Sequence, residues 1–295
     1  MRRLEPGDTV ALVTPAGPVP SEVLDRAVAA LEAWGLVVRR PPTPGTGTGT
    51  VPPYLADGDE RRAADFQAAW LDPGVAAVIA ARGGYGTQRM LDLVDWSALR
   101  AAGPKPFAGS SDITALHQAI ATHLSWPTLF SPMPAGTFWD EEASEGLRRM
   151  LFGPATPVVL PAAEALSPGI ARGPLTGGNL SLLAAGLGTP EQRGAAGAIV
   201  VLEDVEEQPY RLDRMLTQLL RAGWFDGVAG IALGSWTGCG EPEAVRAVML
   251  DRLCPLGVPI LWDLRFGHLP GAATLPLGGE AVLDATTLHL TVTPK

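Results

Sequence analysis

The sequence has few cysteines, few lysines and almost no asparagine. Its 295 residues include two cysteines, Cys239 and Cys254, and two lysines, Lys105 and Lys295, while Asn179 is the single asparagine. Two separated cysteines exclude a disulfide framework and a C-x-x-C motif. Because the chain has only two lysines, arginine supplies nearly all of its positive charge. This preference for arginine suits a thermophile and equally a GC-rich genome.

The chain also lacks an excess of positive charge and a long hydrophobic run. Asp and Glu number 31 against 22 Lys and Arg, so the net charge is −9. This charge balance disfavours binding to nucleic acid, because proteins that bind it neutralise its phosphates with many basic side chains. No apolar run approaches the ~20 residues of a membrane span, and residues 1–8 contain no signal-peptide core. We therefore expect a cytoplasmic protein that binds neither nucleic acid nor membrane.

What the sequence does contain is enough apolar residues for two packed domains. Hydrophobic residues make up 46% of the chain, alongside 35 glycines and 28 prolines. That apolar share is typical of a globular protein, and the length is that of about two domains. We expect an N-terminal domain at 1–150, a linker at 151–172, where periodicity is lost and prolines collect, and a C-terminal domain at 173–295.

Short apolar runs alternate with amphipathic stretches in the first domain, which predicts an α/β fold. The repeated β-α units favour a doubly wound, mostly parallel sheet that binds ligands at the carboxyl ends of its strands. Expected strands lie at 9–13, 36–38, 75–80 and 106–108, helices at 21–34, 59–71, 88–94 and 112–121, and a Gly/Thr/Pro-rich loop at 41–53. The second domain is expected to be smaller and mixed α/β, with strands near 198–202, 228–233, 258–261, 281–283 and 287–293, and helices near 180–187, 211–222 and 243–253.

One segment has the pattern of a strand, an exposed serine and a helix. Residues 107–114 read Phe-Ala-Gly-Ser-Ser-Asp-Ile-Thr, and a helix is expected just after Ser111. Such a turn lifts a serine into the open and aims the next N–H at the same point, where the helix N-terminus favours an oxyanion. The G-x-S-x-G pattern is not met, because Ile113 stands two residues after Ser111. Alternatively, Ser110 or Ser111 simply caps the helix.

A glycine-rich turn follows the buried strand at 75–80. Residues 82–86, Arg-Gly-Gly-Tyr-Gly, have backbone N–H groups that can face an anion or an oxyanion, although an ordinary turn has the same composition. Neither G-x-G-x-x-G nor G-x-x-x-x-G-K-[ST] occurs. No histidine or cysteine has a neighbour at metal-ligand spacing, so we expect no metal and no cofactor.

A serine nucleophile needs a general base. Of the four histidines, His268 lies in a loop rich in glycine and proline, where functional residues are common. His117 and His123 fit structural roles within and at the end of a helix, and His289 fits an exposed strand position. His268 is therefore the candidate base.

The base needs an acid to orient it. Glu203 directly follows the apolar run 198–202, at a strand end where sites form. Asp204 and Asp263 are rival acids, and spacing alone does not choose among the three.

Several motifs follow one another in a characteristic order. They are Arg-Gly-Gly-Tyr-Gly at 82–86, Gly-Ser-Ser-Asp-Ile-Thr-Ala-Leu at 109–116, Gly-Gly-Asn-Leu at 177–180, Leu-Glu-Asp-Val at 202–205 and Phe-Gly-His at 266–268. With the opening residues 4–16, this series runs nearly from end to end. It resembles the LD-carboxypeptidases, the muramoyltetrapeptide carboxypeptidase family of serine peptidases.

The resemblance implies a mechanism and a substrate. It makes Ser111 the nucleophile, His268 the base and Glu203 the orienting acid, with an oxyanion hole from the backbone of Asp112 and of Gly83–Gly84. The active site would lie between the domains. Family members remove the C-terminal D-alanine from murein tetrapeptide by cutting an L,D-amide bond, in the cytoplasm and without a metal. They are often dimers, which allows a homodimer here.

Five residues within or beside these motifs are candidates for binding the peptide substrate. They are Arg82, Tyr85, Tyr210, Arg211 and Arg265, and the arginines suit substrate carboxylates.

Two segments depart from the family pattern, and both are expected near the substrate channel. Ser110 replaces an aromatic residue that is frequent in the family, and 131–133 reads Ser-Pro-Met where His-Gly-Pro-Met is usual. Two other functions stay open. One is a related amide hydrolase that confers immunity to a peptide-nucleotide antibiotic, and the other is a non-catalytic ligand-binding protein of the same fold.

Overall fold

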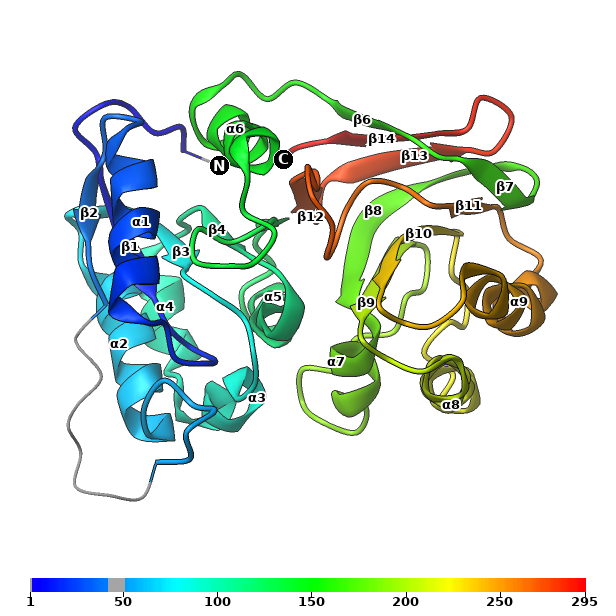
Figure 1. The fold of residues 1–295 in the computed structure, drawn as a ribbon, viewed down its shortest axis with the longest axis horizontal. Helices are drawn as coiled ribbons and strands as arrows, with labels where there is room; N and C mark the ends of the chain where they lie inside the picture. Colours follow the sequence, from blue (N-terminus) through cyan, green and yellow to red (C-terminus); the bar gives the residue numbers. More distant parts are fainter. Residues whose placement is uncertain (1, 42–50) are drawn as a thin grey trace.

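The computed structural model describes residues 2–41 and 51–295, which form two sheets that lie side by side with their helices (Figure 1). The loop expected at 41–53 falls largely at 42–50, outside the described residues. No helix in the described part of the chain is long and apolar enough to cross a membrane.

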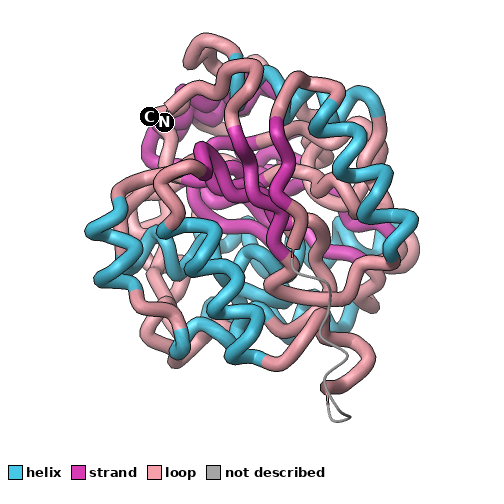
Figure 2. Tube along the Cα trace, turned by 90° about the vertical axis from the view of Figure 1, so that its left-hand side faces the viewer, coloured by secondary structure: helices cyan, strands magenta, loops and turns pink. Residues whose placement is uncertain are grey.

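The first sheet has the strand order β12-β5-β4-β3-β1-β2, in which β1 to β5 are parallel and β12 is antiparallel to β5. This order confirms the doubly wound, mostly parallel sheet. Figure 2 shows this side of the molecule, with cyan helices packed around the magenta strands. The strands are β1 (Thr9–Val13), β2 (Val37–Arg39), β3 (Val75–Ala80), β4 (Phe107–Gly109), β5 (Thr128–Phe130) and β12 (Leu275–Leu277). The helices are α1 (Ser21–Glu32), α2 (Asp59–Leu71), α3 (Thr87–Met90), α4 (Trp96–Ala102), α5 (Thr114–His123) and α6 (Glu141–Phe152).

Side-chain alternation in the strands explains why helices cover both faces of this sheet. Successive residues of a strand point to opposite faces. Leu12 in β1 therefore packs in one core with Leu31 of α1, while its neighbour Val13 packs in the other core with Phe66 of α2. All six residues of β3 are buried, as a continuous apolar run predicts for a central parallel strand.

The second sheet has the order β6-β14-β13-β8-β9-β10-β11-β7, with a parallel centre from β8 to β11 and antiparallel strands outside it. Helices α7, α8 and α9 share a core with one face (Figure 1). The other face shares a core with Phe130 of β5 and Leu275 of β12, so the two sheets are packed together. The strands are β6 (Val158–Pro161), β7 (Glu164–Ser167), β8 (Ile170–Asn179), β9 (Ile199–Val205), β10 (Gly230–Thr237), β11 (Ile260–Trp262), β13 (Glu280–Asp284) and β14 (His289–Thr293). The helices are α7 (Leu180–Ala185), α8 (Pro209–Arg221) and α9 (Pro242–Leu253).

Residues 151–172, expected as a linker, contain strands instead. The segment holds β6, β7 and the start of β8, all in the second sheet. β6 and β7 are its two outermost strands, where prolines such as Pro161 are tolerated because one edge needs no partner. β12, from the C-terminal part of the chain, pairs with β5 of the first sheet. The chain therefore crosses between the two halves three times, where a simple division at 151–172 implies one crossing.

Candidate active site

Ser111 lies at the sharp turn between β4 and α5. Its backbone is left-handed, with a φ of +61°, a conformation that residues with a side chain rarely adopt. A 3-10 turn, Ser111–Ile113, continues directly into α5. Ser110 occupies the N-cap position of this turn, but its side chain makes no capping hydrogen bond. The geometry is thus that of a strained, outward-turned serine rather than of Ser110 capping a helix.

The glycine-rich turn after β3 packs directly against Ser111. A Cβ added to Gly83 would lie 2.9 Å from Ser111 Cβ and 3.1 Å from its Oγ, closer than such atoms pack. The Gly83 carbonyl accepts a hydrogen bond from the Gly17 N–H at 3.2 Å, and Gly84 has a φ of +124°. Glycine at position 83 therefore permits the turn to touch the candidate nucleophile.

The side chain of Asp112 joins these two turns. Its buried carboxylate accepts a hydrogen bond of 2.8 Å from the backbone N–H of Thr87, the first residue of α3. Burial raises the pKa of Asp112, and the bonds to Thr87 and the charge of Arg62 oppose that rise. Arg62 is also buried and donates to the Gly86 carbonyl at 2.8 Å. The end of the glycine-rich turn is therefore held between a buried cation and a buried carboxyl group.

His268 and Glu203 form a close pair in the second half of the chain. His268 Nδ1 lies 2.5 Å from Glu203 Oε2, and the Glu203 side chain is fully buried in β9. Because the carboxylate only accepts, Nδ1 carries the hydrogen and Nε2 is left to accept a proton. Gly267 has a φ of +100°, and a Cβ there would lie 2.6 Å from Glu203 Oε2. Glycine at 267 thus lets the loop bring His268 onto the carboxylate.

Opposing influences set the pKa of His268. Burial is the largest single influence and lowers it, but the charge and hydrogen bond of Glu203, helped by the charges of Asp204 and Glu206, outweigh burial. The pKa of His268 is therefore raised, which makes the imidazole better able to hold a proton taken from a hydroxyl group.

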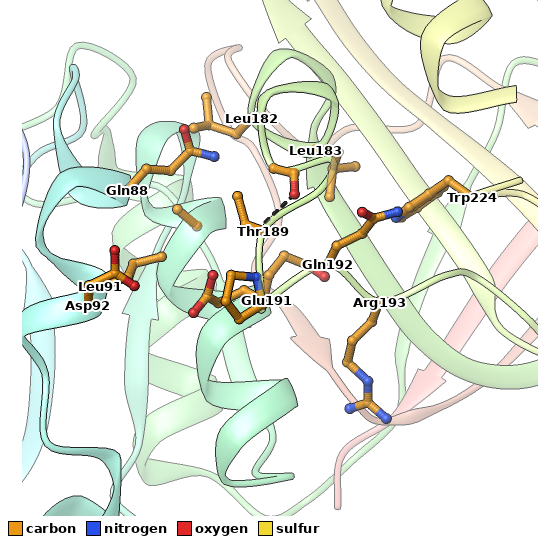
Figure 3. Close-up of a pocket in the computed structure, with 14 residues that line it drawn as sticks. Gln88, Leu91, Asp92, Leu182, Leu183, Thr189, Glu191, Gln192, Arg193 and Trp224 are labelled. Carbon is orange, nitrogen blue, oxygen red and sulfur yellow. Dashed lines mark hydrogen bonds between the residues drawn. The ribbon is translucent and has the colours of Figure 1, made fainter. Parts of the chain in front are cut away.

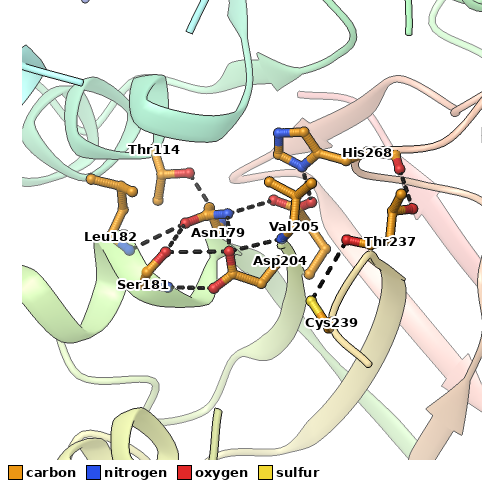
Figure 4. A network of polar contacts seen from close by, with 10 residues as sticks. Thr114, Asn179, Ser181, Leu182, Asp204, Val205, Thr237, Cys239 and His268 are labelled. Atoms are coloured by element: carbon orange, nitrogen blue, oxygen red, sulfur yellow. Dashed lines mark hydrogen bonds and ion pairs between the residues drawn. The ribbon is translucent and has the colours of Figure 1, made fainter. Parts of the chain in front are cut away.

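Asn179 connects the Glu203 carboxylate to its surroundings (Figure 4). Its Nδ2 donates to Glu203 Oε1 at 3.2 Å and to Asp204 Oδ1 at 2.9 Å. Its backbone N–H donates to Thr114 Oγ1 at 3.0 Å, in the first turn of α5. Asn179 thus touches both the candidate acid and the helix that follows the candidate nucleophile. The Gly-Gly-Asn-Leu motif pointed to this position but not to its role.

A cavity of about 150 Å³ contains both Ser111 and His268. The ring of Phe138 lies edge-on to His268, with centroids 5.9 Å apart, a contact that sequence reasoning missed although Phe138 lies in a loop rich in glycine and proline. Both segments that depart from the family pattern contribute to the wall, through Ser110, Pro132 and Met133. The lining residues are Arg82, Gly83, Gly84, Ser110, Ser111, Pro132, Met133, Gly136, Thr137, Phe138, Gly267 and His268.

Of the five candidate substrate-binding residues, the described wall of this cavity includes Arg82 alone. Arg82 Nη1 donates to the Pro18 carbonyl at 2.9 Å. The other four lie elsewhere: Tyr85 packs against Tyr54, Tyr210 lies beneath the guanidinium of Arg214, Arg211 pairs with Glu207, and Arg265 lines a different cavity with Glu142 and Arg149.

The remaining histidines make contacts typical of structural residues. His117 is buried, and its Nε2 faces the Gly109 carbonyl at 2.9 Å while Nδ1 faces Thr128 Oγ1 at 2.8 Å. Burial lowers the pKa of His117 to about 4. His123, at the end of α5, pairs with Glu191, and His289 contacts a backbone carbonyl in its own hairpin. Among residues 2–41 and 51–295, no group of three or more His, Cys, Asp or Glu could hold a metal ion.

A second cavity, of about 110 Å³, lies between the two halves of the chain (Figure 3). It is lined by Gln88 and Leu91 from one half, by Leu182 and Trp224 from the other, and by the loop 189–193. None of Ser111, Glu203 or His268 is part of its described wall, so it is distinct from the cavity that holds the serine and histidine.

The sequence matches two family models that together cover most of its length. The LD-carboxypeptidase N-terminal domain matches residues 10–131, and the LD-carboxypeptidase C-terminal domain matches residues 172–283. Ser111 lies within the first match, and Glu203 and His268 lie within the second.

Known proteins resemble the chain over nearly its full length. A Streptomyces coelicolor protein whose name places it among carboxypeptidases is 53% identical, over 98% of this chain and 94% of its own. The murein tetrapeptide carboxypeptidase of Pseudomonas aeruginosa is 33% identical, over 95% of this chain and 94% of its own. The crystal structure of muramoyltetrapeptide carboxypeptidase from Oxalobacter formigenes superposes with a TM-score of 0.85 at 29% identity, covering 97% of this chain and 100% of that one.

Proposed function

The chain belongs to the LD-carboxypeptidase family, and from this premise we propose that it removes the C-terminal D-alanine from murein tetrapeptide by cutting an L,D-amide bond. It is a serine carboxypeptidase, as the family and its full-length relatives indicate. The observation that carries the assignment of roles is one cavity containing both Ser111 and His268, with Glu203 bonded to the far side of the imidazole.

The first half of the reaction forms an acyl-enzyme. Ser111 Oγ attacks the amide carbonyl while His268 Nε2 takes the hydroxyl proton, and Glu203 stabilises the resulting imidazolium. The imidazolium then gives this proton to the leaving amino group of D-alanine as the C–N bond breaks. The raised pKa of His268 suits it to hold the proton between the two transfers.

The second half hydrolyses the ester between Ser111 and the shortened peptide. His268 takes a proton from water, the hydroxide attacks the ester carbonyl, and the proton returns to Ser111 Oγ. Water supplies both the oxygen of the new carboxylate and the remaining proton, so the enzyme is regenerated.

Backbone N–H groups around Ser111 would stabilise the oxyanion of both steps. The candidates are the N–H of Asp112, which follows the nucleophile, and that of Gly83 or Gly84 in the adjoining turn. Supporting this, the Gly83 carbonyl bonds to the Gly17 N–H. The Gly83 carbonyl and the Gly84 N–H belong to the same peptide group, and in a trans peptide they point in opposite directions. The Gly84 N–H is therefore directed away from Gly17.

Arg82 is the proposed partner of a substrate carboxylate. Among the described residues that line the cavity, it carries the single permanent positive charge. In a protein with a net charge of −9, such a local cation would offset the repulsion of a peptide with several carboxylates.

We further propose that the enzyme works in the cytoplasm, where stem peptides are recycled. Its cysteines, Cys239 and Cys254, are both free thiols, which suits a reducing compartment. A homodimer is proposed from the family resemblance alone, and sedimentation velocity of the purified protein would test it.

Mass spectrometry of murein tripeptide, tetrapeptide and pentapeptide after incubation with the enzyme tests the proposed function. We expect loss of one alanine from the tetrapeptide alone, and no loss with a Ser111→Ala variant. Equal rates for wild type and Ser111→Ala would overturn the role of Ser111. Cleavage of a peptide-nucleotide amide without cleavage of the tetrapeptide would favour the immunity hydrolase. Absence of both activities, with no labelling of Ser111 by a fluorophosphonate, would favour a binding protein.

A further inference from the structure

The amide of Asn179 has one orientation that satisfies all of its neighbours. Its Oδ1 accepts from Ser181 Oγ at 2.8 Å and from the Leu182 N–H at 3.3 Å, where it caps α7. Its Nδ2 donates to the carboxylates of Glu203 and Asp204. Turning the amide over would place its oxygen against two carboxylates and its NH₂ against two donors.

Asp204 fixes the NH₂ end of this amide. Its Oδ1 accepts from Asn179 Nδ2 at 2.9 Å and from Ser181 Oγ at 3.2 Å, and its Oδ2 accepts from the Ser181 N–H at 2.9 Å. The Asp204 side chain is therefore anchored to the start of α7, beside Asn179 (Figure 4). Asn179 and Asp204 are 2% and 1% exposed, so water does not readily replace these bonds.

We propose that Asp204 is a positioning residue for the catalytic acid, acting through Asn179. Asp204 takes one N–H of the amide and holds the other on Glu203 Oε1. That bond turns the carboxylate so that Oε2 faces His268 Nδ1. This inference rests on the proposed roles of Glu203 and His268, and Asp204 itself touches neither the base nor the reacting atoms.

The charge of Asp204 affects the pKa of His268, which can be measured. The charged and titratable groups that interact with Asp204 are Glu203 on its own strand, His268 on the loop after β11, the Cys239 thiol after β10 and Arg211 on α8. Burial, followed by the charge of Glu203, raises the pKa of Asp204 to about 6. Above that pH, its negative charge favours the imidazolium form of His268.

An Asp204→Asn variant removes the charge while keeping the size of the side chain. The imidazolium loses a nearby negative charge, so the pKa of His268 should fall, and the acid limb of kcat/KM should move to lower pH. We expect kcat to fall by between about tenfold and a hundredfold, the cost of a misplaced catalytic group. KM should change little, because Asp204 does not line the substrate cavity. Ser181→Ala, which removes one contact to each of Asp204 and Asn179 but no charge, should lower kcat by a smaller factor.

Glu206→Gln is the matched control. Glu206 is exposed, lies two residues from Asp204 and also raises the pKa of His268 through its charge, but it makes no bond in the network around Asn179 in the described structure. We expect this variant to shift the pKa of His268 slightly and to leave kcat within about twofold of the wild type.

The experiment combines kinetics with NMR titration of ¹³C-labelled histidine in the substrate-free proteins. The chain has four histidines, and a His268→Gln variant assigns the signal. The proposal is supported if Asp204→Asn lowers both kcat and the pKa of His268 beyond the effect of Glu206→Gln. It is overturned if Asp204→Asn matches the control, or if only its unfolding temperature falls. Should Asp204→Asn not fold, kcat of Ser181→Ala decides, because this variant keeps the charge of Asp204 and removes only contacts. A fall in kcat beyond that of Glu206→Gln supports the proposal, and an equal kcat overturns it. The titration needs no substrate, so it still tests the effect of Asp204 on His268 if the wild type fails to cleave tetrapeptide.

Discussion

Replacing Gly83 with alanine should disable Ser111, the proposed nucleophile, while leaving the protein folded. The new methyl carbon would lie 2.9 Å from Ser111 Cβ, whereas nonbonded carbon atoms are most stable about 3.5–4.0 Å apart. The glycine-rich turn or the serine must therefore move by roughly 0.6–1.1 Å. Gly83 does not have a positive φ, so alanine adds no strain from a left-handed backbone. The collision with Ser111 is the closest one, and a contact of 3.3 Å with Met133 Cε, at the end of a flexible side chain, is the next.

The expected loss follows from the size of this displacement. A misplacement of about 1 Å in a catalytic group costs about a hundredfold in rate, which is about 2.7 kcal/mol of transition-state stabilisation. The added methyl also restricts the unfolded chain, which is worth about 0.4–1 kcal/mol and partly offsets the strain of the collision. Activity should therefore fall far more than stability does.

The assay is kcat/KM on L,D-tetrapeptide, measured beside the free energy of unfolding in urea. Gly146→Ala, in the middle of α6, is the control, because a Cβ there would approach only Thr274 Oγ1, at 3.9 Å. That variant should keep full activity and gain about 0.5–1 kcal/mol, the usual difference between alanine and glycine in a helix. If Gly83→Ala retained kcat/KM within threefold of the wild type, contact between the turn and Ser111 would not control the reactivity of that serine, and the prediction would be wrong.

Three further predictions follow from the same structure. Glu203→Gln should lower kcat by about 10⁴-fold and move the acid limb of the remaining activity to lower pH, because Glu203 raises the pKa of His268; an unmoved acid limb in the pH–rate profile would contradict this. Arg82→Ala should raise KM for tetrapeptide severalfold with little change in kcat if Arg82 binds a substrate carboxylate, and unchanged steady-state kinetics would refute that role. Because the pKa of His117 is lowered from 6.5 to about 4, its stabilisation is present above pH 6.5 and is lost as the pH falls. Urea unfolding should lose about 2 kcal/mol more between pH 7 and 5 in the wild type than in His117→Gln, and equal losses would contradict this.

The central strands were predictable because burial on both faces leaves a continuous apolar run. The expected strands at 9–13 and 75–80 coincide with β1 and β3. The helix α6 was missed although its signal was present: Asp140 caps it, and Ala143, Leu147 and Leu151 recur at a spacing of four.

Three of the missed strands, β6, β7 and β12, carry no comparable local signal. β6 and β7 are edge strands with half-exposed residues, so neither strict alternation nor a buried run marks them. β12 has three residues and pairs with β5, about 145 positions earlier in the chain. Such a short strand is stable only because its partner and the core between the sheets already exist, and a local pattern cannot report either one.

The candidate acids illustrate the same difference between local and tertiary information. Glu203 and Asp204 are neighbours on one strand, so their side chains point to opposite faces of the sheet, and spacing cannot decide which one meets the histidine. The structure turns Glu203 toward His268 and Asp204 toward the start of α7. Both carboxyl groups are nevertheless buried and share the amide of Asn179. A buried acid with no direct contact to the base is costly unless its bonds serve the fold or the site. The bond from Asp204 to Asn179 serves both, because the same amide that caps α7 holds the carboxylate that faces His268.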